Sequence, residues 1–81
     1  MITKAFNLYG SEGCHLCELA QSLILKNIPD HQLKIIDIVN DQLNGLNLIE
    51  LYGIHIPVLE RISDGAKLFW PFEQTQVVEL I

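Results

Sequence analysis

A change of hydrophobic period within the first 39 residues most constrains the fold of this chain. Residues 4–10 alternate as a strand does. From Cys14 the apolar residues recur every three or four positions, which predicts an amphipathic helix that ends near Asn27, because Pro29 cannot continue it. Residues 33–39 are apolar enough for a strand buried on both faces. This order predicts a βαβ unit with two parallel neighbouring strands.

The second half of the chain begins with a weaker helical pattern. Asn40 or Asp41 can cap a helix that runs to about Tyr52. Gly53 is then suited to the C-terminal cap. Gly45 lowers the helix propensity of this segment by about 1 kcal/mol relative to alanine.

The last third of the chain predicts a hairpin and a closing helix. Residues 57–62 and 66–70 have strand character and flank the turn Asp64-Gly65. Residues 73–81 predict a short helix after the second of these strands. Its inward side chains are expected to be Val77, Val78 and Ile81.

The elements together predict one small α/β domain. Their order is β-α-β-α-β-β-α, which gives a four-stranded mixed sheet flanked by helices. A chain of 81 residues buries roughly 60% of the surface that its unfolded form exposes. Hydrophobic residues make up 49% of the chain, which supports one packed core and argues against disorder.

The charge distribution excludes several classes of function. The net charge is −5, and the five basic residues are scattered singly, so no basic stripe could neutralise nucleic-acid phosphates. No apolar run approaches the ~18 residues of a membrane span. Residues 1–10 predict a strand rather than a signal peptide. We therefore expect a cytoplasmic protein, a monomer, with no nucleic-acid or membrane partner, in a compartment where thiols are mostly reduced.

Cys14 and Cys17 are the only two cysteines, and their spacing indicates redox chemistry. Residues three apart on a helix share a face, with Cα atoms at about the separation that a disulfide requires. As a structural staple the pair would constrain the unfolded chain little, because the loop is so short. Unpaired N–H groups and the dipole at the helix start favour a thiolate on Cys14, whereas Cys17 lies deeper. We expect Cys14 to attack a disulfide and Cys17 to resolve the mixed disulfide.

The neighbouring residues both favour and disfavour a thiolate at Cys14, and two cysteines at this spacing also have other uses in proteins. A protonated His15 favours the Cys14 thiolate, whereas Glu12 and Glu18 disfavour it. A zinc site needs four ligands, and His31 and His55 form no paired ligand motif with the cysteines. Covalent haem needs a histidine directly after the second cysteine, where Glu18 stands. We expect no metal site, although two structural cysteines at a helix start remain an alternative.

Four stretches of the chain carry a resemblance to a known family. They are "LYGSEGCHLCE", "IIDIV", "YGIHIPVL" and "GAKLFWPF". In this order they resemble the thioredoxin-fold superfamily and, within it, the small glutaredoxin-like proteins; "CHLCE" and "WPF" are most similar to a compact branch of these. The resemblance implies a thioredoxin-like fold and a single glutaredoxin-like domain over residues 1–81.

The resemblance also implies roles for residues outside the cysteine motif. Pro57 would follow a cis peptide bond and face the cysteines, and the Ile56 backbone would pair with an extended substrate segment. Trp70 would either belong to the core or form an apolar wall beside the site. Within the motif itself, we expect His15 to contact the substrate. Glutathione-using relatives carry a basic residue shortly before the first cysteine, but no Lys or Arg occurs between residues 5 and 25 here. The reductant is therefore open between glutathione and a reductase.

The expected function is that of a small thiol–disulfide oxidoreductase acting on protein or small-molecule disulfides. It needs no cofactor beyond the two sulfurs. One alternative is a metal or iron–sulfur binding module in which two subunits each donate cysteines. The other is a non-catalytic interaction domain of thioredoxin fold.

Overall fold

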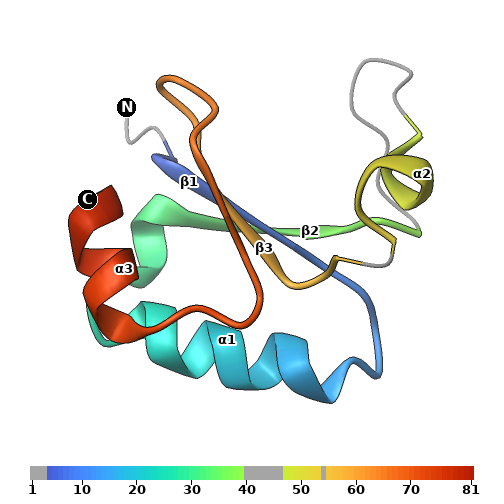
Figure 1. Ribbon diagram of the computed structural model, residues 1–81, viewed down its shortest axis with the longest axis horizontal. Helices are drawn as coiled ribbons and strands as arrows, with labels where there is room; N and C mark the ends of the chain where they lie inside the picture. Colours follow the sequence, from blue (N-terminus) through green and yellow to red (C-terminus); the bar gives the residue numbers. More distant parts are fainter. Residues whose placement is uncertain (1–3, 40–46, 54) are drawn as a thin grey trace.

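The structure, a computed structural model, describes residues 4–39, 47–53 and 55–81, and its elements follow the predicted order (Figure 1). The strands are β1 (Phe6–Gly10), β2 (Leu33–Asp37), β3 (Val58–Arg61) and β4 (Lys67–Phe69). The helices are α1 (His15–Leu25), a 3₁₀ turn (Asp30–Gln32), α2 (Leu48–Tyr52) and α3 (Gln74–Leu80).

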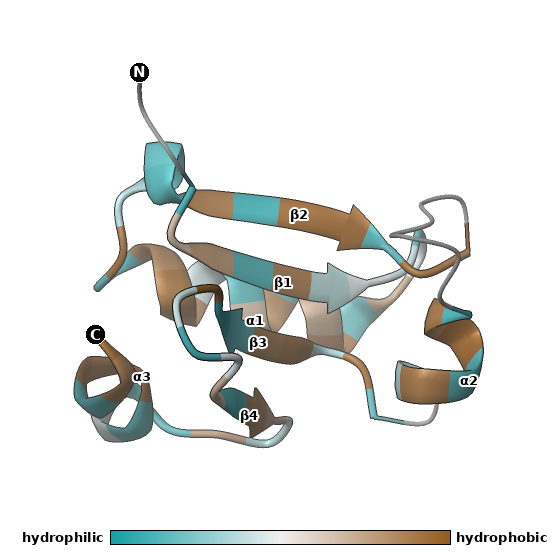
Figure 2. Cartoon of the chain, turned by 90° about the horizontal axis from the view of Figure 1, so that it is seen from above, coloured by the Kyte–Doolittle hydropathy of each residue, from teal (hydrophilic) through white to brown (hydrophobic). Residues whose placement is uncertain are grey.

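The four strands form one mixed sheet in the order β2-β1-β3-β4. β1 pairs in parallel with β2 and antiparallel with β3, and β3 pairs antiparallel with β4. Figure 2 shows the strands in this order, with α1 behind the sheet. The predicted βαβ unit and four-stranded mixed sheet are confirmed.

The core lies mainly on the face of the sheet that α1 and α3 cover (Figure 1). Each strand contributes alternate side chains to it, because residues of one strand face alternately to the two sides, and each helix contributes residues three or four positions apart. Its buried members are Phe6, Leu8, Ala20, Ile24, Ile28, Leu33, Leu59, Phe72, Val77 and Leu80. A smaller cluster on the other face contains Tyr9, Ile36, Ile38, Leu48 and Val58, and α2 packs there.

The β3–β4 hairpin is tied to the end of α3 by one arginine. The Arg61 guanidinium donates to the Asp64 carboxylate in the turn and to the Leu80 carbonyl, at 2.7 Å. The hydrogen bond from Arg61 lowers the pKa of Asp64 to about 2. The Gly65 N–H closes the predicted turn on the Arg61 carbonyl at 2.8 Å.

Two expectations about buried faces were wrong in part, although Ile36, Ile38 and Val77 are buried as expected. Ile35 is 51% exposed, because β2 is an edge strand and α1 leaves this part of its face uncovered. In α3 the buried residues are Val77 and Leu80, which are one turn apart, whereas Val78 and Ile81 are exposed. The capping box of Glu73 with Gln76 fixes where this helix begins. Packing against the main core selects the face that carries Val77 and Leu80.

The second helix is shorter than expected. α2 begins at Leu48, and the Asn47 side chain accepts a hydrogen bond from the Glu50 N–H at 3.2 Å, as an N-cap does. The predicted caps Asn40 and Asp41 and the residue Gly45 lie outside the described residues. Gly53 is the C-terminal cap, as predicted.

A polar network lies on the sheet face opposite α1. The Tyr9 hydroxyl donates to Glu60 Oε1 at 2.6 Å, and Asn7 Nδ2 donates to the same oxygen at 2.9 Å. Lys67 Nζ lies 3.4 Å from Glu60 Oε2. The Tyr9 ring stacks on Tyr52 of α2, with centroids 4.4 Å apart. The network therefore joins three strands and fixes the position of Tyr9, on which α2 packs. These contacts indicate a structural rather than a catalytic role for Tyr9.

We expect Tyr9→Phe to lower the free energy of unfolding by about 1–2 kcal/mol, because it removes a hydrogen bond to a partly buried carboxylate. The matched control is Tyr52→Phe, which makes the same chemical change where the hydroxyl has no hydrogen-bond partner among the described residues. Urea unfolding of both variants measures the difference. Equal losses in the two variants would contradict the assignment.

Glu60 should make stability depend on acid pH. Burial raises the pKa of Glu60, but the hydrogen bonds from Tyr9 and Asn7 and the charge of Lys67 together lower that pKa below 4.5. The folded state therefore gains stability from the ionised carboxylate above pH 4.5 and loses it as the pH falls through the folded pKa. We expect Glu60→Gln to be less stable than wild type at pH 7, with a difference that shrinks below pH 4.5. A difference that stays constant from pH 7 to pH 3 in urea unfolding would refute this.

Candidate redox site

The two cysteines lie where β1 passes into α1. Gly13, in the connecting loop, has φ +77°, a left-handed conformation that glycine adopts without strain. Cys14 is the N-cap of α1, and Cys17 lies in its first turn. Their Cα atoms are 5.2 Å apart and their sulfurs form a disulfide. This separation is within the range of ordinary disulfides, so the geometry expected from the spacing is confirmed.

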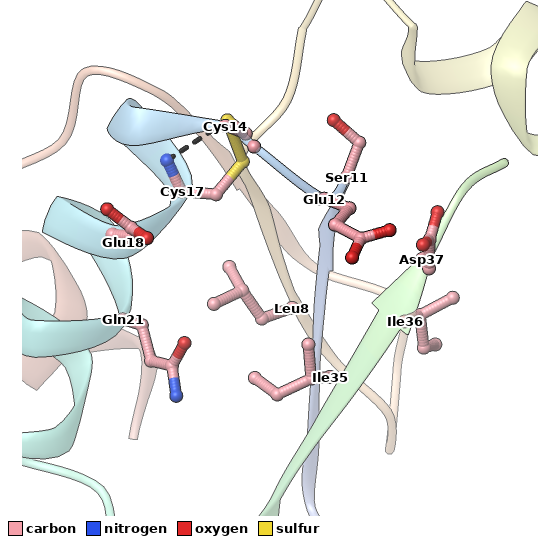
Figure 3. Close-up of a pocket in the computed structure, with 12 residues that line it drawn as sticks. Leu8, Ser11, Glu12, Cys14, Cys17, Glu18, Gln21, Ile35, Ile36 and Asp37 are labelled. Atoms are coloured by element: carbon pink, nitrogen blue, oxygen red, sulfur yellow. Dashed lines mark hydrogen bonds between the residues drawn. A yellow bond between two sulfur atoms is a disulfide. The ribbon is translucent and has the colours of Figure 1, made fainter.

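A backbone donor points at the sulfur of Cys14. The Cys17 N–H lies 3.1 Å from Cys14 Sγ, where a serine or aspartate oxygen accepts in most N-caps (Figure 3). The Glu18 N–H donates to the Cys14 carbonyl at 3.3 Å. When the disulfide is reduced, the donor to Sγ and the partial positive charge of the helix start both favour a thiolate at this sulfur.

The two sulfurs differ in exposure. Cys14 is half-buried, whereas Cys17 is 9% exposed and counts among the core residues. Gly10 makes room for Cys17, because a Cβ at that position would lie 3.0 Å from Cys17 Sγ. The sequence marked Gly10 only as the end of a strand, and its second role depends on where α1 sits.

A pocket of about 340 Å³ lies beside the disulfide, between α1 and the two parallel strands (Figure 3). The β1–α1 loop and both cysteines form one wall, and Leu8 and Ile35 contribute apolar surface. Its other lining residues include Glu12, Glu18, Gln21 and Asp37. Sequence reasoning did not find Gln21, Ile35 or Asp37. Ile35 and Asp37 could have been found from the predicted parallel pairing of the first two strands, which puts Leu8 beside Ile35 and Gly10 beside Asp37.

The charged residues of the pocket are all acidic among the described lining: Glu12, Glu18 and Asp37. Asp37 Oδ1 accepts a hydrogen bond from the Val39 N–H at 2.8 Å. His15 Nδ1 lies 3.7 Å from Glu18 Oε2, and the His15 side chain is 81% exposed. His15 thus lies within the motif, at the first residue of α1, and its contact with substrate stays a prediction.

The Ile56–Pro57 peptide bond is cis, as the resemblance implied. Pro57 is buried, and its carbonyl accepts from the Trp70 N–H at 3.2 Å. A second cis bond, Trp70–Pro71, was not foreseen. Trp70 packs edge-to-face on Phe72, with centroids 5.1 Å apart, and against the main core. Ile56, Pro57 and Trp70 do not line the pocket, so their contact with substrate stays a prediction.

The remaining two histidines do not line the pocket beside the cysteines. His31 is exposed in the 3₁₀ turn, and His55 packs edge-to-face on Phe69 with centroids 5.4 Å apart. Within residues 4–39, 47–53 and 55–81, no group of three or more His, Cys, Asp and Glu residues is placed to hold a metal ion. The described helices also include none long and apolar enough to cross a membrane.

Comparison with known proteins agrees with this geometry. The family model "Glutaredoxin-like domain (DUF836)" matches residues 6–81. The X-ray structure of Northeast Structural Genomics target protein XcR50 from X. campestris is similar, with a TM-score of 0.74 and 27% sequence identity over 94% of this chain and 93% of that chain. The comparison with curated proteins gives no match. The fold is thioredoxin-like, the cysteine pair at its helix start supports a redox function, and the chain belongs to the glutaredoxin-like domain family.

Proposed function

We propose that the protein is a thiol–disulfide oxidoreductase that reduces protein or small-molecule disulfides. The observation that carries the proposal is the Cys14–Cys17 disulfide at the start of α1, with the Cys17 N–H directed at the half-buried Cys14 sulfur. Membership of the glutaredoxin-like family supports the same chemistry. No cofactor beyond the two sulfurs takes part in it.

The proposed reaction runs in two exchange steps. The Cys14 thiolate forms a bond with one sulfur of the substrate disulfide, and the other sulfur leaves as a thiolate that takes up a proton. Cys17, deprotonated, then bonds to Cys14 Sγ and releases the second substrate thiol. Two electrons pass from the cysteine pair to the substrate. Two molecules of glutathione, or a reductase, return the pair to the dithiol.

The differences between the two cysteines support their order of action. Cys14 is reachable from solvent and has the backbone donor, whereas Cys17 is almost buried. Resolution needs no large movement, because the Cα atoms already lie 5.2 Å apart within one helical turn. Protein substrates would dock by their backbone along Ile56, next to the buried Pro57, with Trp70 and His15 flanking them. We place this activity in a reducing compartment such as the cytoplasm.

We expect Cys17→Ser to accumulate mixed disulfides, because Cys14 can attack but nothing resolves the adduct. Cys14→Ser should not accumulate them, since Cys17 is 9% exposed. Each variant is incubated with cell extract or with 2-hydroxyethyl disulfide, and adducts are detected by non-reducing gels and intact mass. Equal trapping by both variants would sink the assignment of roles.

The same preparations separate the proposed enzyme from the two alternatives. Trapping by neither variant, together with no turnover of small disulfides by wild type, would favour a non-catalytic interaction domain. Stoichiometric zinc, or the visible absorption of an iron–sulfur cluster in wild type purified without oxygen, would favour a metal-binding module shared between subunits. We expect a colourless, zinc-free protein.

A further inference from the structure

The pocket beside the disulfide has the size and the position of a binding site for a small molecule. Its volume of about 340 Å³ lies at the small end of the range for small-molecule sites. The Cys14–Cys17 disulfide forms part of its wall, so a molecule bound there lies next to the reacting sulfurs. Ile35, 51% exposed on the edge strand β2, adds apolar surface to the lining. An apolar stem of a few carbons would cover it.

Among the described residues that line this space, the charged side chains are all acidic. Glu12 and Glu18 flank the cysteine motif, and Asp37 lies at the end of β2 across the pocket (Figure 3). The start of α1 contributes only about half a positive charge. A protonated His15 would offset Glu18 but no more. Glu12 and Glu18 alone therefore keep the sum negative in either protonation state of that histidine.

All five basic side chains lie away from the pocket lining. Arg61 and Lys67 form ion pairs on the β3–β4 hairpin. Lys34 alternates along β2 with Ile35, so it points to the opposite face of the sheet. Lys26 caps the far end of α1, and Lys4 precedes β1 at the end opposite the disulfide. A substrate carboxylate entering the pocket would find no cationic side chain.

We propose that this pocket makes the protein a reductase for small cationic disulfides, namely those of aminothiols with an ammonium a few carbons from the sulfur. The ammonium would lie among the carboxylates, the methylenes on Leu8 and Ile35, and the attacked sulfur at Cys14. Dianionic disulfides, glutathione disulfide among them, would be poor substrates. This inference rests on the proposed function and adds the substrate class.

The test compares three small disulfides of different charge: cystamine (cationic), 2-hydroxyethyl disulfide (neutral) and 3,3′-dithiodipropionate (anionic). Each kcat/KM is divided by the rate at which dithiothreitol reduces the same disulfide, which removes differences in leaving-group reactivity. We expect the normalised value for cystamine to exceed that for dithiodipropionate about tenfold at low salt. The ratio should approach one at about 0.5 M salt, because screening weakens the attraction.

Variants show whether the pocket carboxylates cause the preference. Glu12→Gln combined with Glu18→Gln should lower the cystamine-to-dithiodipropionate ratio at least threefold. A changed thiolate population at Cys14 alters both rates together, so the ratio cancels it. The control is Glu79→Gln, which removes one carboxylate charge from α3, at the opposite end of the molecule from the disulfide, and is compared with Glu12→Gln and Glu18→Gln made singly (Figure 1). It should leave the ratio unchanged.

The outcomes separate the two proposals. Reduction of all three disulfides with equal normalised rates, or a ratio that the double variant does not lower, would overturn the charge preference and leave the oxidoreductase standing. A ratio lowered as much by Glu79→Gln would assign the effect to net charge and also overturn it. Reduction of none of the three would overturn the proposed function, and the substrate class with it.

Discussion

The parallel pairing of β1 with β2 is the constraint on which the rest of this structure depends. It requires a crossover, and α1 provides it, so the start of α1 lies at the carboxyl end of β1. That placement seats Cys17 against Gly10, where any side chain on the strand would meet its sulfur. It also puts Leu8 and Gly10 beside residues of β2 and thereby builds the pocket. The redox pair and the space beside it thus come from one strand pairing.

Much of this arrangement follows from local sequence. The change of period before and after Cys14 predicts a strand followed by a helix, and the spacing to Cys17 puts two sulfurs on one turn. The turn at Asp64-Gly65 could also be predicted from local sequence, because its residue types favour a tight connection between two strands. The cis bond before Pro57 was different: nothing local indicates it, and only the resemblance of the surrounding stretch did.

The features that the sequence did not predict depend on which helices and strands become neighbours in the fold. Ile35 looks like a core residue in any window of the sequence, and only the place of β2 at the sheet edge exposes it. The bond from Tyr9 to Glu60 joins residues 51 positions apart, and Asp37 reaches the pocket only through strand register. In α3, Val77 and Leu80 are buried because the helix packs on the main core through these two residues, and the apolar pattern of residues 77, 78 and 81 did not distinguish that face. Periodicity indicates that a face is apolar, but tertiary packing decides whether it is covered.

The acidic residues near the cysteines and the start of α1 have opposite effects on the Cys14 thiolate. A carboxylate at Glu12 or Glu18 disfavours the Cys14 thiolate, whereas the Cys17 N–H and the helix start favour it. Under the proposed substrate class, an ammonium bound among the carboxylates would cancel their repulsion at the moment of attack. The thiolate would then be most favoured in the complex with its substrate and less favoured in the free protein. In a site of this kind, the Cys14 thiolate would form most readily when a positively charged molecule occupies the pocket.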